Sequence, residues 1–168
     1  REKIGAVSAI EGAAVTVLLG SHGGARPVSL SIGGVVVIPT ELATLYGMVH
    51  ALRATSANSR CAEIQLLGEV PNTQAARFRR GVGVYPDFDA RVFRAGADDL
   101  AMLYAPPAAA TVRLGCVAQA PELGAYALTD DLLAKHFAVL GTTGSGKSCA
   151  VSLILHAVLD QNPNGHIV

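Results

Sequence analysis

Short apolar runs separated by turn-forming residues fill the chain from Lys3 to about Val70, and this layout predicts β-strands. In residues 62–66, apolar Ala, Ile and Leu alternate with Glu and Gln. A two-residue period is typical of a strand with one buried face and one face in water. We therefore expect five strands, over Ile4–Ile10, Ala14–Leu19, Val35–Ile38, Leu45–Leu52 and Ala62–Leu67.

Five strands of this length suit a small closed β-barrel, because closure leaves no strand edge unpaired. After a short helix expected over Asp98–Tyr104, Pro106 and Pro107 with three alanines read as a linker. We place the domain boundary there, with a barrel domain over residues 1–106 and a second domain over 107–168.

The second domain has the pattern of an α/β fold. Two strands are expected over Thr111–Ala118 and Ala125–Leu128, and Thr129-Asp130-Asp131 can cap a short helix. The apolar run His136–Leu140 predicts a buried parallel strand. A helix over Cys149–Leu159 and the start of a further strand at Gly165–Val168 complete the expected elements.

Between the predicted strand and helix of the second domain lies the sequence Gly141-Thr142-Thr143-Gly144-Ser145-Gly146-Lys147-Ser148, which matches the phosphate-loop pattern G-x-x-x-x-G-K-[ST]. Its glycines allow successive backbone N–H groups to converge on phosphate oxygens, at the positive end of the following helix. In this pattern the lysine side chain reaches the β- and γ-phosphates, and the Ser148 hydroxyl is the Mg²⁺ ligand. The chain is therefore predicted to bind a nucleotide.

Five arginines against two aspartates make residues 77–94 the one positively biased segment, although the whole chain has no net charge. Contact with a nucleic-acid phosphate backbone, helped by Phe78 or Tyr85, is one interpretation. A solvated loop or an inter-subunit salt-bridge surface is the interpretation we favour, because no repeated aromatic platform accompanies the arginines.

Composition argues against a disulfide-rich protein, a zinc site and a membrane-spanning protein. The three cysteines lack C-x-x-C spacing, which argues against disulfides or zinc and favours the reducing cytoplasm. His22 and His50 likewise have no Cys or His at ligand spacing. No uncharged run exceeds about 14 residues, too short to cross a bilayer, and no signal peptide opens the chain.

The sequence resembles the HerA family of hexameric ATP-dependent DNA translocases. The residues that carry the resemblance are Ile4-Gly5-Ala6-Val7, Leu30-Ser31-Ile32-Gly33, Leu66-Leu67-Gly68-Glu69, Arg79-Arg80-Gly81-Val82 with Tyr85-Pro86, and Lys135 to Ser148. It implies a barrel shared with rotary ATP synthase subunits, followed by the first strand, phosphate loop and helix of a RecA-like domain. The resemblance also implies that residues 141–148 and the backbone of Cys149 bind the phosphates of the nucleotide, and that Lys147 is catalytic.

The resemblance also implies ATP and Mg²⁺ as cofactors, a ring of six subunits, duplex DNA in the channel, and a nuclease or effector docked on the barrel. The acidic metal partner, the water-orienting residue and the arginine finger are expected beyond Val168, so this chain alone should hydrolyse ATP poorly. Two alternatives stay open. The chain could act as an assembly and docking module, or belong to another barrel-plus-motor ATPase such as a rotary synthase-like subunit.

Overall fold

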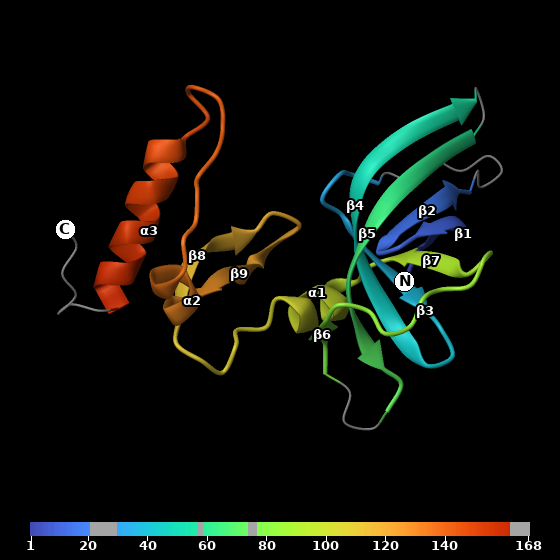
Figure 1. Ribbon diagram of the computed structural model, residues 1–168, viewed down its shortest axis with the longest axis horizontal. Coiled ribbons are helices and arrows are strands. Elements are labelled where there is room, and N and C mark those ends of the chain that lie inside the picture. The colour runs from blue at the N-terminus through green and yellow to red at the C-terminus, as the bar shows by residue number, and fades with distance from the viewer. Residues whose placement is uncertain (21–29, 57–58, 74–76, 162–168) are drawn as a thin grey trace. The chain divides into compact units, whose positions relative to one another are not determined.

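The computed structural model describes residues 1–20, 30–56, 59–73 and 77–161. Within it the chain divides into two compact units, Arg1–Leu103 and Tyr104–Val168 (Figure 1). The predicted strand start at Gly165 and the histidine at position 22 lie outside the described residues. The functional boundary placed between residues 106 and 107 remains a prediction.

The first unit is a closed antiparallel barrel of six strands. In spatial order the strands run β2, β1, β7, β3, β4, β5, and β5 pairs again with β2 to close the ring. A short strand, β6, is added to β5 outside the ring. The bounds are β1 Lys3–Glu11, β2 Ala14–Leu19, β3 Val35–Pro39, β4 Ala43–Ser56, β5 Ser59–Pro71, β6 Arg79–Arg80 and β7 Arg91–Arg94.

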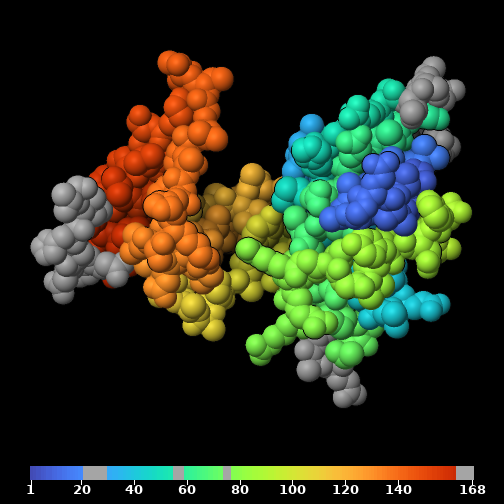
Figure 2. Space-filling model, viewed as in Figure 1, coloured from blue at the N-terminus to red at the C-terminus, as the bar shows by residue number. Residues whose placement is uncertain are grey.

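The expectation of a five-stranded barrel was one strand short. All five predicted ranges are strands, but the ring needs β7, which falls inside the basic segment. This strand pairs with β1 on one side and β3 on the other, and the atoms of β1 and β7 lie against each other in the space-filling view (Figure 2). Its one fully buried residue, Val92, belongs to the core, while the arginines at the two ends of the strand are not buried.

The core of the barrel is built almost entirely from β-branched and aliphatic side chains, which suit the pleated inner face of a sheet. Register shifts in the β4–β5 pair let these two long strands curve around that core. The core cluster comprises Ile4, Val7, Val15, Val17, Val36, Ile38, Ala43, Leu45, Val49, Ala62, Ile64, Leu66 and Val92.

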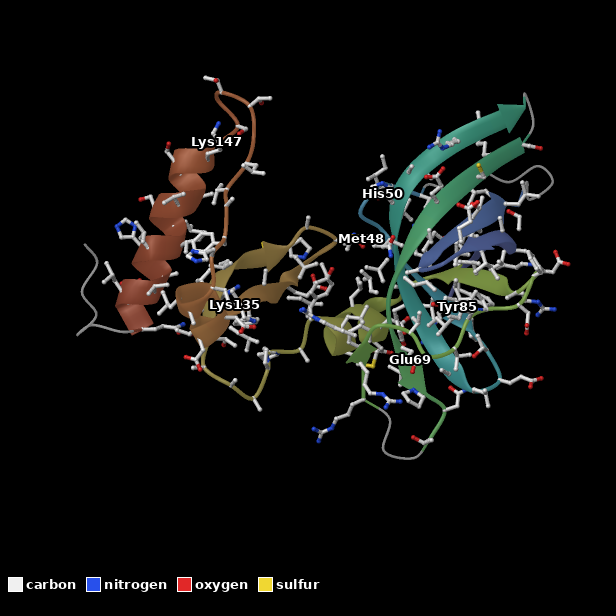
Figure 3. All side chains as sticks on the ribbon, in the orientation of Figure 1. Met48, His50, Glu69, Tyr85, Lys135 and Lys147 are labelled. Carbon is white, nitrogen blue, oxygen red and sulfur yellow. The ribbon has the colours of Figure 1, made fainter. Side chains whose placement is uncertain are left out.

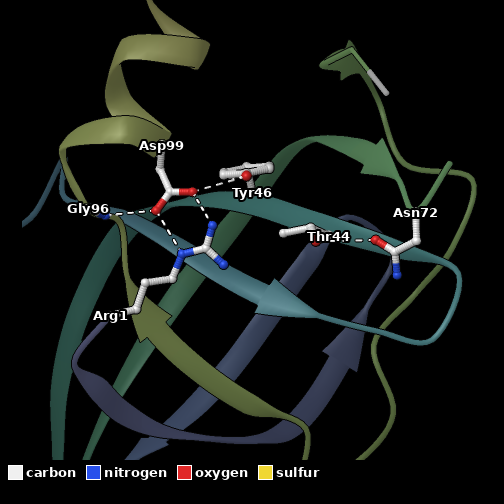
Figure 4. A network of polar contacts seen from close by, with 6 residues as sticks. All are labelled: Arg1, Thr44, Tyr46, Asn72, Gly96 and Asp99. Atoms are coloured by element: carbon white, nitrogen blue, oxygen red, sulfur yellow. Dashed lines mark hydrogen bonds and ion pairs between the residues drawn. The ribbon is translucent and has the colours of Figure 1, made fainter. Parts of the chain in front are cut away.

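A buried carboxylate attaches the helix α1, Ala97–Leu103, to the barrel (Figure 4). The Asp99 carboxylate accepts hydrogen bonds from the Arg1 guanidinium (Nε to Oδ2, 2.9 Å), from the Tyr46 hydroxyl (3.1 Å) and from the Gly96 amide (2.9 Å). Desolvation alone would raise the pKa of Asp99, but the hydrogen bonds from Arg1 and Gly96 outweigh it and lower the pKa below its usual value.

The second unit contains a hairpin and two helices. The strands β8, Thr111–Val117, and β9, Ala120–Leu128, pair with each other and are followed by α2, Thr129–Ala134, and α3, Lys147–Gln161. The predicted fold class, a β-barrel followed by the start of an α/β domain, is thus confirmed.

Two local predictions in this unit are wrong. Residues 136–140 form no strand, and Phe137 and Leu140 are 58% and 89% exposed. A segment becomes a strand only when a neighbour takes up its N–H and C=O groups, and no described strand pairs with this one. The α2 helix is not capped by Thr129 either, because Leu128 occupies the N-cap without a side-chain hydrogen bond and Thr129 is buried in the first turn.

Candidate functional site

The predicted phosphate loop is an exposed turn that leads directly into α3. The Ala150 amide donates to the Gly146 carbonyl at 2.9 Å, which is the first hydrogen bond of the helix. The amides of Lys147, Ser148 and Cys149 precede it and therefore have no acceptor within the helix. They are available at the positive end of the helix dipole, where an anion is stabilised.

Two glycines give the loop its shape. Gly144 and Gly146 have φ angles of 81° and 85°, in the left-handed region that favours glycine. Between them, the Ser145 amide donates to the Thr142 carbonyl at 3.2 Å and closes a tight turn. Left-handed and right-handed backbone conformations therefore alternate from Gly144 to Gly146. Such alternation turns successive backbone N–H groups toward one concave surface that can bind an anion.

Lys147 lies at the first position of α3 and its ammonium returns to the loop (Figure 3). Its Nζ donates to the Thr142 carbonyl at 2.6 Å, so the positive charge is held beside the turn. The side chain is half-buried, while the rest of residues 141–149 are exposed. An ammonium held beside these backbone amides adds positive charge to the same anion-binding surface.

The residues present fit a nucleotide with a hard divalent cation. The loop offers amides and an ammonium to phosphate, and the exposed Ser148 hydroxyl offers the oxygen ligand that Mg²⁺ prefers. In the part of the chain that the structure describes, no three His, Cys, Asp or Glu side chains gather as metal ligands. Lys135, the other lysine near the loop in sequence, is paired instead with Asp131 at 2.7 Å.

Sequence reasoning missed two buried carboxylates, both in the first unit. Glu69 accepts the amides of Gly83 and Val84 at 2.8 and 3.2 Å and holds the turn after β6. Asp99 accepts the Gly96 amide three residues before it, as in a capping box. An acidic residue three positions after a glycine at the start of a predicted helix was the available signal for Asp99. Neither group lies in the phosphate-loop unit.

A family model described as "Helicase HerA, central domain" matches residues 112–168. Over these residues the chain is similar to the central domain of the HerA family. The match spans the β8–β9 hairpin, the phosphate loop and α3, and it indicates a domain of the HerA ATPase type. Comparison with curated protein sequences gave no match.

The HerA-family match favours a HerA-type motor over a rotary synthase-like subunit, one of the two alternatives raised by the sequence. The barrel that precedes the matched segment is consistent with it. Among the described helices, none combines the length and apolar character needed to span a bilayer.

Proposed function

We propose that this chain belongs to an ATP-driven DNA translocase of the HerA type, which works in the cytoplasm as a ring of six subunits. Its phosphate loop is the site of ATP and Mg²⁺. The observation that carries the proposal is the exposed loop at residues 141–148, with two left-handed glycines and an anchored lysine ahead of a 15-residue helix.

Each loop residue has a distinct part in this proposal. The amides of Gly144 to Cys149 bind phosphate oxygens, and Thr142 and Thr143 form the wall of the turn with Gly141. The Lys147 ammonium moves from the Thr142 carbonyl toward the β- and γ-phosphates and stabilises the charge that develops there, which is its catalytic role. The Ser148 hydroxyl holds Mg²⁺, which when bound neutralises phosphate charge.

A second candidate function concerns the barrel. Its ring of strands is closed and its core is complete, so it folds around its own side chains and leaves its outer wall for other molecules. Large apolar side chains are also exposed in the turns before and after β3, including Ile32 at 68% and Leu42 at 69%. We propose that the barrel also contributes to subunit assembly or docks a nuclease or effector.

The nucleotide site is tested by Lys147→Ala in the full-length protein, with Lys135→Ala as the matched control. Both substitutions remove one partly or fully exposed lysine, and they lie 12 positions apart. We expect ATP hydrolysis to fall about a hundredfold or more in Lys147→Ala, because one preorganised charge on the transferred group is lost. Lys135→Ala should retain the rate. Normal hydrolysis by Lys147→Ala would refute the assignment.

A further inference from the structure

Three arginines lie within four residues on the outer edge of the barrel. Arg77, Arg79 and Arg80 are all exposed, and the last two form the short strand β6. The structure therefore replaces the solvated loop expected for this part of the basic segment with a strand fixed to β5.

The backbone that carries these arginines packs closely against strand β5. Arg79 and Arg80 pair with Glu69 and Gly68 of β5. A Cβ on Gly68 would lie 2.1 Å from the Arg79 carbonyl oxygen and 2.6 Å from the Phe78 ring, so only glycine allows this approach. The Phe78 ring also packs edge-on against Tyr46, with centroids 6.0 Å apart. The arginine side chains thus project from a fixed base.

Most of the charge at β6 is not neutralised by the barrel. The nearest carboxylate, Glu69, uses Oε2 for two backbone amides, and its Oε1 lies 3.8 Å from the Arg79 guanidinium. Among the described residues, Arg77 and Arg80 have no ion pair within 4.0 Å. By contrast, Arg53 on β4 is paired with Glu63.

The surroundings of β6 favour a phosphate backbone over a protein surface. Protein interfaces depend on a buried apolar centre, and none of the exposed large apolar side chains of the barrel lies in residues 77–81. Phosphate contacts need charge and hydrogen-bond donors alone, and a guanidinium supplies both in a fork that fits two phosphate oxygens.

We propose that Arg77, Arg79 and Arg80 form a surface on the barrel that binds the phosphate backbone of DNA, separate from the nucleotide loop. This inference rests on the proposed translocase function and adds a DNA contact outside the motor domain. Because backbone contacts carry no base information, the surface should bind duplexes regardless of sequence.

The test measures binding of a fluorescent blunt-ended DNA duplex to the full-length protein over a series of salt concentrations. The variant is Arg77→Gln with Arg79→Gln and Arg80→Gln. The control changes three other exposed barrel arginines, Arg53, Arg60 and Arg91, to Gln and so removes the same charge. We expect the first variant alone to lower the slope of log affinity against log salt by about 2 to 3 and to bind DNA at least tenfold more weakly.

Thermal unfolding and ATP binding should match the unchanged protein in both variants, which establishes that fold and nucleotide site are intact. Equal slopes in the two variants would overturn the surface while leaving the translocase proposal in place. Loss of the oligomer in size-exclusion chromatography with an unchanged slope would also overturn it and assign the arginines to inter-subunit salt bridges. If the unchanged protein binds no duplex, the translocase function fails together with this surface.

Discussion

The two units of the chain differ in where their apolar side chains lie. In the barrel, thirteen residues form one buried cluster inside a closed ring of strands. In the second unit the one buried residue of α3 is Val158, and Leu153 of the same helix is 51% exposed. The barrel is therefore stabilised by its own buried core, whereas the second unit presents an exposed loop and a helix whose apolar side chains remain open to other contacts.

The largest expected effect tests this contrast directly. Ile64→Ala removes a fully buried core side chain of the barrel and should lower the free energy of unfolding by about 2–5 kcal/mol. Leu153→Ala on α3 should change it by about 0.5 kcal/mol or less, because the side chain is half in water. Denaturant unfolding of both variants measures the difference. A loss as large in Leu153→Ala would show that other parts of the full-length protein cover α3.

The next largest effect concerns the attachment of α1. Asp99→Ala leaves the Tyr46 hydroxyl and the Gly96 amide without their acceptor, and should destabilise the barrel by about 1.5–3 kcal/mol. Asp99→Asn keeps an acceptor and should cost less. Hydrogen exchange of residues 97–103 would locate the loss. Equal exchange in Asp99→Ala and the unchanged protein would show that the contacts of Leu100, not the carboxylate, hold the helix.

The same carboxylate predicts a dependence on pH. Its pKa in the folded protein is lowered, so the stability it contributes is present above the ordinary value of an aspartate, about 4, and is lost as pH falls through the folded pKa. The difference in unfolding free energy between the unchanged protein and Asp99→Asn should therefore shrink below about pH 4. A difference that stays constant down to pH 2 would contradict the lowered pKa.

A smaller effect separates the two units by function. Gly146→Ala places a Cβ at a φ of 85° and should weaken nucleotide binding about tenfold, since a left-handed conformation costs roughly 1–2 kcal/mol. Gly12→Ala imposes similar strain, at a φ of 58°, on the turn between β1 and β2. Titration with a fluorescent ATP analogue should detect the first change and not the second. Thermal unfolding of the barrel should show the reverse.

Much of this architecture could be predicted because it depends on local patterns. The five apolar strands and the loop at residues 141–148 each carry a period or a motif that specifies local geometry. The strand β7 was missed because Val92 and Phe93 between two arginines are too short an apolar run to indicate a strand, and its partners come from distant parts of the chain. The strand predicted over residues 136–140 is wrong although its apolar run is long enough, because an apolar run cannot show whether a neighbouring strand pairs with it.

The candidate site divides in the same way. The motif predicted the left-handed conformations of Gly144 and Gly146, but Gly141 does not adopt one, and the helix expected from Cys149 begins two residues earlier, at Lys147. It could not predict that the Lys147 ammonium rests on the Thr142 carbonyl, because that contact depends on the side-chain rotamer in the folded loop. The roles of these residues in binding ATP and Mg²⁺ stay predictions.

The pairing of β1 with β7 has a consequence for synthesis. Lys3 lies opposite Phe93, so the ring cannot close until the chain as far as Phe93 has left the ribosome. The β1–β2 and β4–β5 hairpins can form earlier, but they expose their apolar faces until β7 arrives. Once it arrives, the barrel holds all of its strands some fifty residues before the phosphate loop is made, so the barrel can fold before the loop at residues 141–148 exists.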